Sequence, residues 1–140
     1  MFGHRSFLML GSDTPADIRS LISGGYEALQ VNYAFSQGVD RKGKVQTRVW
    51  GGQIKLTLPM LPPDEIMEWA LSFRSYKDGV VVLCEADNLP VEKLAFTNAA
   101  CVHLKVNYTN MGTGYVNTHL VIVAEELNLG NLKYESEWQH

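Results

Sequence analysis

The chain has 140 residues, of which 46% are hydrophobic and 19% charged, and it carries a formal net charge of -3 with a pI of about 5.8. This length suits one domain with a single core, and the slightly acidic balance gives no global electrostatic reason to bind nucleic acid. No stretch reaches the about 18 consecutive apolar residues of a membrane span, and the apolar run at residues 7–10 is too short for the core of a signal peptide. We therefore expect a chain that is made and folded in the cytoplasm, with Cys84 and Cys101 reduced and buried in strands.

We interpret residues 7–10 as a short first strand, and residues 26–59 as the second and third strands, joined by a basic turn. In the second strand polar residues alternate with the residues of a buried face, Leu29, Val31, Tyr33 and Phe35. In the third strand the apolar residues change parity, from Val45 and Val49 to Ile54, Leu56 and Leu58. A bulge or sharp bend at Gly51 and Gly52 would permit this change.

The connection between these strands carries Arg41, Lys42 and Lys44 around Gly43. It is longer and more charged than a tight hairpin requires, so we expect it to project from the domain. Phosphate, RNA, an acidic surface of another protein and simple solvation all remain possible for it.

A helix is predicted at residues 64–73. Pro63 suits the first helical position, Asp64 and Glu65 favour the positive end of the helix dipole, and apolar residues recur at helical spacing. This electrostatic explanation is complete for Asp64, Glu65 and Glu68, so no acid/base role is assigned to them.

Four more segments are expected to be strands. Residues 80–84 form a short apolar run that indicates a strand buried on both sides, and residues 91–96 follow the next turn signal. A further strand is expected to bury Ala100, Val102, Leu104, Val106 and Tyr108, and a hairpin turn at residues 110–114 leads to its partner at residues 115–127. Within that partner residues 120–124 are apolar on both faces, so the helix or another subunit must cover them. The predicted fold class is mainly β: a compact barrel of two packed antiparallel sheets, with seven or eight strands and one flanking helix.

No catalytic constellation is present in the sequence. His103 and His119 fall on polar faces of the predicted hairpin as diagonal neighbours, but no third ligand stands at supporting spacing for a metal. We expect no cofactor, no metal and no enzymatic activity, and we predict a polar face formed by His103, Lys105, Asn107, Asn117 and His119.

The order of the segments is the most informative feature of the chain. YEALQVNYAFSQGVD is followed by RKGK, VWGGQIKLTL, EIMEWAL, YKDGVVVLCEAD, LAFTNAACVHLKVNY and TGYVNTHLVIVAEELNLGN. Over residues 26–131 this order resembles the Hcp family of type VI secretion tube proteins, particularly the Bacteroidetes form called TssD. The resemblance divides a single domain, residues 1–140, into a core at 26–131, a loop insertion at 12–25 and a C-terminal tail at 132–140.

The resemblance implies a subunit that forms sixfold rings, which stack into the inner tube of a contractile injector. Such a protein assembles in the cytoplasm, is secreted without a signal peptide, and can carry small effectors in the ring lumen. Its expected partners are further copies of itself, the sheath, baseplate and spike proteins and small effector proteins, but not nucleic acid or a membrane.

In the family the long loop between the second and third strands reaches the next ring. Carried over, this ring-stacking loop comprises Asp40, Arg41, Lys42, Lys44, Val45, Arg48, Val49 and Trp50. The apolar members would anchor it, and the cations would select an acidic surface. Two alternatives stay open: a monomeric or dimeric barrel that binds a small ligand, and an enzyme built around His103 and His119.

Overall fold

The computed structural model describes residues 4–11, 22–35, 46–72, 74–87, 89–112 and 114–131, with the backbone alone for residues 46–50 and 131. Within these residues the strands are β1 (Ser6–Leu10), β2 (Tyr26–Ala28), β3 (Gln30–Ala34), β4 (Gln46–Trp50), β5 (Gln53–Leu58), β6 (Lys77–Cys84), β7 (Pro90–Thr109) and β8 (Tyr115–Asn131). Helix α2 (Asp64–Leu71) lies between β5 and β6. The predicted basic loop at residues 40–45, most of the 12–25 insertion and the 132–140 tail lie outside the described residues.

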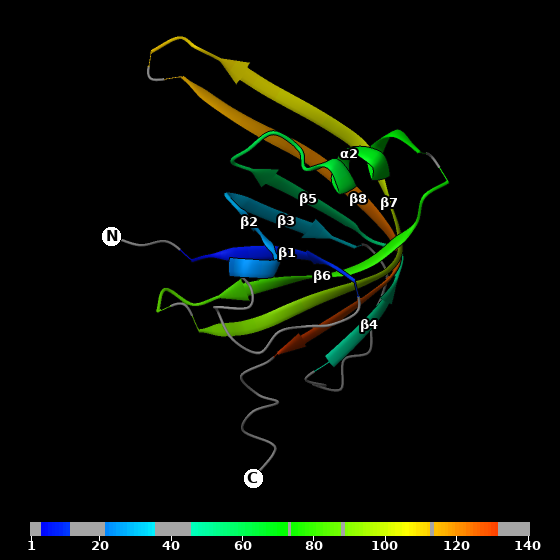
Figure 1. Cartoon of the computed structure of the whole chain (residues 1–140). Helices are drawn as coiled ribbons and strands as arrows, with labels where there is room; N and C mark the ends of the chain where they lie inside the picture. The colour runs from blue at the N-terminus through cyan, green and yellow to red at the C-terminus, as the bar shows by residue number, and fades with distance from the viewer. Residues whose placement is uncertain are drawn as a thin grey trace.

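The strands form one antiparallel sheet in the order β2-β1-β6-β7-β8-β5-β3, with β4 also paired to β8. The mainly β class with a flanking helix, α2, is confirmed, residues 22–24 are also helical, and the strands join in a single curled sheet instead of two packed ones (Figure 1). Leu29 alone separates β2 from β3, so one short segment supplies both ends of the sheet. The Leu29 N–H donates to the Thr57 carbonyl at 2.7 Å. This crossing closes the sheet on itself and brings its two edges together.

The break between β4 and β5 falls at Gly51 and Gly52, as predicted, and both have positive φ, at 79° and 156°. The Gly51 N–H donates to the Glu125 carbonyl at 2.6 Å, and the Gly52 carbonyl accepts from the Ala124 N–H at 3.0 Å. A Cβ on Gly52 would overlap the Leu127 side chain. Glycine is therefore required here by both conformation and space.

Strands β8 and β7 also bend where they lie beside the Gly51–Gly52 break. On β8 the buried residues change parity from Ala124 to Leu127, and on β7 they change from Phe96 to Ala99. Between these two, Asn98 has a φ of 50°, donates its N–H to Asp78 Oδ1 at 2.9 Å, and donates its side-chain amide to Glu125 Oε1 at 2.8 Å. We call this line across the sheet, from the glycine pair through Glu125 to Asn98, the corner.

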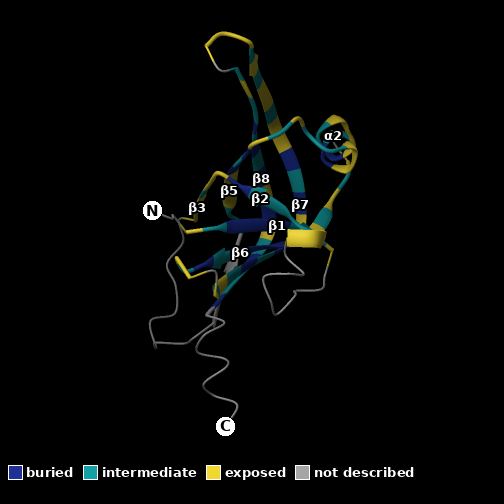
Figure 2. Ribbon diagram, turned by 60° about the vertical axis from the view of Figure 1, so that its left-hand side comes forward, coloured by how far each residue is buried: buried dark blue, intermediate teal, exposed yellow. Residues whose placement is uncertain are grey.

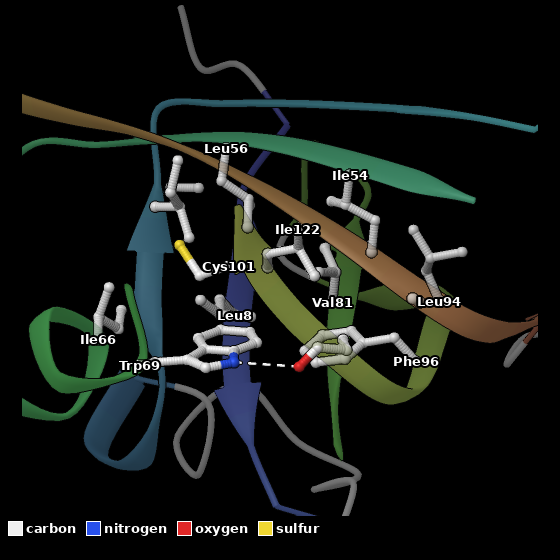
Figure 3. Packing of buried hydrophobic residues seen from close by; sticks show 14 of the residues in the cluster. Leu8, Ile54, Leu56, Ile66, Trp69, Val81, Leu94, Phe96, Cys101 and Ile122 are labelled. Atoms are coloured by element: carbon white, nitrogen blue, oxygen red, sulfur yellow. Dashed lines mark hydrogen bonds between the residues drawn. The ribbon is translucent and has the colours of Figure 1, made fainter. Parts of the chain in front are cut away.

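Helix α2 inserts its buried residues Ile66 and Trp69 into the main core (Figure 3). The Trp69 ring stacks on Phe96 with centroids 6.1 Å apart and planes 14° apart, and its Nε1–H donates to the Ala99 carbonyl at 3.0 Å. Pro63 is the N-cap residue, one position before the predicted one, and the helix ends at Leu71. No helix in the described part of the chain is long and apolar enough to cross a membrane.

Strand β6 is buried on both faces, as predicted. Val81 belongs to the main core, whereas Val80, Val82 and Cys84 form a second cluster with Phe7 on the opposite face. Arg5 lies over the Phe7 ring at 5.2 Å from its centroid and holds Glu27 through two hydrogen bonds of 2.7 Å, which joins β2 to the chain just before β1.

Several residues predicted to be buried are exposed. Leu29 is 64% exposed because it occupies the crossing between β2 and β3, and Tyr33 is 40% exposed because β3 pairs with β5 alone among the described strands. Phe35 follows β3 and is also exposed, whereas Val31 packs against the core as predicted. The prediction for β7 was wrong at Val102, because a register shift between Cys101 and His103 turns Val102 outward and Cys101 inward. Cys84 and Cys101 are free and buried.

Candidate functional site

The outward side of the β7–β8 pair carries the predicted polar residues. Leu104 packs against the core and Leu120 is buried, so the residues next to them in sequence face outward. Lys105 pairs with His119, and His103 pairs with Val121. The predicted diagonal relation of His103 and His119 is therefore confirmed by the register.

This outward side continues across β5 and β3 in cross-strand rows. One row runs from Lys105 through His119 and Thr57 to Gln30, and the next from His103 through Val121 and Lys55 to Asn32. The Thr57 hydroxyl and His119 Nδ1 share a hydrogen bond of 2.8 Å, and the Asn107 amide donates to Asn117 Oδ1 at 3.2 Å. We call this surface the polar face; its residues are Gln30, Asn32, Gln53, Lys55, Thr57, His103, Lys105, Asn107, Asn117 and His119.

The polar face carries cationic and amide groups. Its described side chains include Lys55, Lys105 and two imidazoles, but no carboxylate. Farther along β8 the next outward carboxylate is Glu125, which accepts the hydrogen bond from Asn98 at the corner. The surface is suited to contact with a partner that brings negative charge.

An apolar hollow borders the polar face at the corner. It is open to solvent, has a volume of about 460 Å³, and is lined by Tyr76, Asn98, Ala100, Val102, Val123, Ala124 and Glu125. Tyr76, Val102 and Val123 are 60%, 58% and 40% exposed. We call this hollow the apolar notch. The sequence signal for it was the break in alternation at Thr97 and Asn98, which was not recognised as a bend.

The end of the β7–β8 hairpin projects beyond the rest of the sheet (Figures 1 and 2). Near its tip Tyr108 and Met111 are each 79% exposed, and Tyr115 is 60% exposed. Gly112 and Gly114 have positive φ in the predicted turn. Tyr108 and Val106 were predicted to be buried, but both are exposed. In the isolated chain these two apolar side chains are therefore accessible to a neighbouring molecule.

The predicted ring-stacking loop is described only at its end. Asp40, Arg41, Lys42, Lys44 and Val45 lie outside the described residues. The backbone of Arg48, Val49 and Trp50 belongs to β4, where these residues pair with Asn128, Leu127 and Glu126 of β8. The segment thus ends in the sheet.

Burial and pairing shift the pKa values of several titratable groups in the described part of the chain. No group of three His, Cys, Asp or Glu side chains among the described residues is placed to hold a metal ion. Burial raises the pKa of the Cys84 and Cys101 thiols, which disfavours the thiolate that a nucleophile requires. The Tyr26 hydroxyl donates a hydrogen bond of 3.0 Å to Glu65, which links β2 to helix α2. Burial and this hydrogen bond raise the pKa of Tyr26.

Comparison with known proteins identifies a family model over nearly the whole chain. The model described as Hemolysin coregulated protein Hcp (TssD) matches residues 3–139. Comparison with curated proteins gives no match.

Solved structures share the fold. Hcp1 from Flavobacterium johnsoniae has a TM-score of 0.63 and 23% identity, over 89% of this chain and 94% of that chain. Hcp1 from Salmonella typhimurium has a TM-score of 0.56 and 14% identity, over 86% and 85% of the two chains. The sheath/tube terminator of an extracellular contractile injection system, PVC, also has a TM-score of 0.56 and 14% identity, over 88% and 91%.

Proposed function

The chain belongs to the Hcp (TssD) family of tube proteins, and we propose that it is a subunit whose rings stack into the inner tube of a type VI secretion system. The family is one of structural tube proteins and not of enzymes, and the fold is that of Hcp structures. The observation that carries the proposal is the family match over residues 3–139. The burial of both thiols fits a structural role.

The projecting hairpin is the proposed contact between neighbours in a ring. Tyr108, Met111 and Tyr115 expose large apolar side chains at its tip, and aromatic residues and methionine are enriched in protein interfaces. A ring arises when a contact between two different surfaces closes after a fixed number of copies. The hairpin reaches beyond its own sheet, which suits contact with a different surface of the next copy.

The loop at residues 40–50 is the proposed contact between stacked rings. Its cations Arg41, Lys42 and Lys44 would select an acidic surface on the next ring, and Trp50 would anchor the contact. Because β4 is hydrogen-bonded to β8, the loop returns to a fixed position in the sheet. This second contact runs along the tube axis. Because it does not close into a ring, it can repeat from one ring to the next and lengthen the tube.

The polar face is the proposed lumen surface, represented by His103, Lys105, Asn107, Asn117 and His119. The tube is proposed to assemble in the cytoplasm beside sheath and baseplate proteins, and to be expelled with its spike and effector cargo. Similarity to a sheath-tube complex of a contractile injection system supports the sheath as a partner. The interior offers little room for a small ligand, because Ile54, Leu56 and Ile122 are at most 2% exposed.

Light scattering on a size-exclusion column tests the ring contact. The native protein is expected to elute as a multiple of the 15.7 kDa chain, and Tyr108→Ser with Met111→Ser is expected to shift it toward the single chain. Leu71→Ser is the matched control, because Leu71 is 78% exposed on helix α2, outside the hairpin. A native mass of one chain at the highest concentration would contradict the proposal, and so would equal effects of the hairpin and control variants.

A further inference from the structure

The polar face and the apolar notch form one continuous surface. Val102 in the notch precedes His103 of the polar face, and Val123 in the notch lies two residues from Val121, on the same side of β8. Neighbouring strands lie about 4.8 Å apart, so Lys55 and His103, which flank Val121 in one row, are about 10 Å apart at their backbones. An extended segment of a few residues covers that distance.

Where it carries the polar face, the sheet has no covering element on its outward side in the described chain. Its inner face is filled, since Leu120, Ile122 and Ala124 are at most 2% exposed, whereas Val123 beside them is 40% exposed. An apolar notch near two lysines, Lys55 and Lys105, matches a partner that presents an apolar side chain flanked by carboxylates.

We propose that the polar face and the apolar notch together dock an acidic polypeptide segment, with an apolar side chain in the notch and carboxylates at Lys55 and Lys105. This inference rests on the proposed function, because it defines the chemical class of cargo that the tube subunit accepts. The amides of Gln30, Asn32 and Gln53 add donors and acceptors for a peptide backbone.

A polypeptide fits this surface better than a nucleic acid does. The lining of the notch is mainly apolar and offers no cation to a phosphate. Nucleic-acid binding relies on many cations that follow a phosphate backbone, whereas the described polar face has two lysines and the chain carries a net charge of -3.

The test is fluorescence anisotropy with a labelled peptide of alternating glutamate and glycine around one central leucine. The acidic peptide is expected to bind, and the same peptide with lysine in place of glutamate is not. Lys55→Glu with Lys105→Glu should weaken binding at least about tenfold, because two ion pairs become repulsive. Lys93→Glu makes the same kind of charge change on β7 away from the polar face and should leave binding unchanged.

A second variant tests the notch. Val102→Ser should weaken binding of the leucine peptide but not of the peptide with glycine in its place, because only the leucine uses the notch. Equal binding of acidic and basic peptides, equal competition by an oligothymidine strand, or an unchanged affinity in the double lysine variant would overturn the inference.

Light scattering on the same samples separates this inference from the proposed function. Assembled rings that bind no acidic peptide would overturn the docking inference and leave the tube role standing. A chain that binds the acidic peptide but never assembles would support the docking surface and contradict the tube role.

Discussion

Substitution of Gly52 by alanine perturbs the corner in two separable ways. Gly52 has a φ of 156°, which L-residues rarely adopt, and its Cβ would overlap the side chain of Leu127. Gly51 next to it has a φ of 79°, but a Cβ there would meet no atom within 4 Å. Gly51→Ala therefore isolates the backbone strain, and Gly52→Ala adds the steric overlap.

The expected magnitudes follow from these two terms. Placing an L-residue in the left-handed region costs about 1–2 kcal/mol, which sets the loss for Gly51→Ala. Overpacking adds about 1–3 kcal/mol, so Gly52→Ala should lower the free energy of unfolding by about 2–5 kcal/mol in total. That is a large part of the about 5–15 kcal/mol that stabilises a typical domain.

Urea unfolding followed by tryptophan fluorescence measures these losses, and Leu127→Val provides the matched background. This substitution removes the Leu127 methyl that the new Cβ would overlap, so Gly52→Ala should cost less in Leu127→Val than in the native chain. Gly51→Ala should cost the same in both. Equal losses for the two glycine variants, or no coupling between positions 52 and 127, would refute the packing described at the corner.

Four other predictions concern the core, an ion pair, the thiols and the loop. Trp69→Phe removes the hydrogen bond to the Ala99 carbonyl and leaves a small void. Urea unfolding should therefore show that the free energy of unfolding falls by about 2–3 kcal/mol. An unchanged free energy of unfolding would contradict the buried position of Trp69. The hydrogen bonds from Arg5 lower the pKa of Glu27 in the folded chain. The pair therefore stabilises the fold at a pH above the unfolded carboxyl pKa of about 4.3. This stabilisation is lost as the pH falls through the lower pKa of the folded state. Thermal unfolding of Glu27→Gln should therefore depend less on pH in the acid range than that of the native protein, and identical pH profiles would count against the pair. Burial raises the pKa of both thiols, so a disulfide reagent at about pH 8 should label Cys84 and Cys101 only after denaturation, and rapid labelling of the native protein would disprove their burial. Trp50→Ala should weaken ring stacking more than ring closure, which microscopy checks by counting tubes against single rings; tubes of normal length would exclude Trp50 as the anchor.

Elements whose structure depends on residues close in sequence were predictable from local patterns. The apolar run at residues 80–84, the helical spacing of Ile66 and Trp69, and the glycine pair between β4 and β5 were all confirmed. The hairpin turn and the diagonal relation of His103 and His119 were confirmed as well, because turn chemistry sets the register of a hairpin.

Features that depend on contacts distant in sequence were not predictable. The single curled sheet results from the crossing at Leu29, where β2 pairs with β1 and β3 with β5. The bend at Asn98 depends on partners on β6 and β8, so the strand pattern of β7 alone did not reveal it. Tyr108 has the pattern of a buried residue but is 79% exposed near the end of β7, just before the hairpin turn. The roles of the ring-stacking loop and of the lumen residues, and the division into core, insertion and tail, stay predictions.

Negative-stain microscopy of the purified chain tests the tube-subunit role most directly. We expect ring-shaped particles with a central hole, which stack into short tubes as the concentration rises. Compact particles without a hole at every concentration, with a light-scattering mass of a single 15.7 kDa chain, would contradict it.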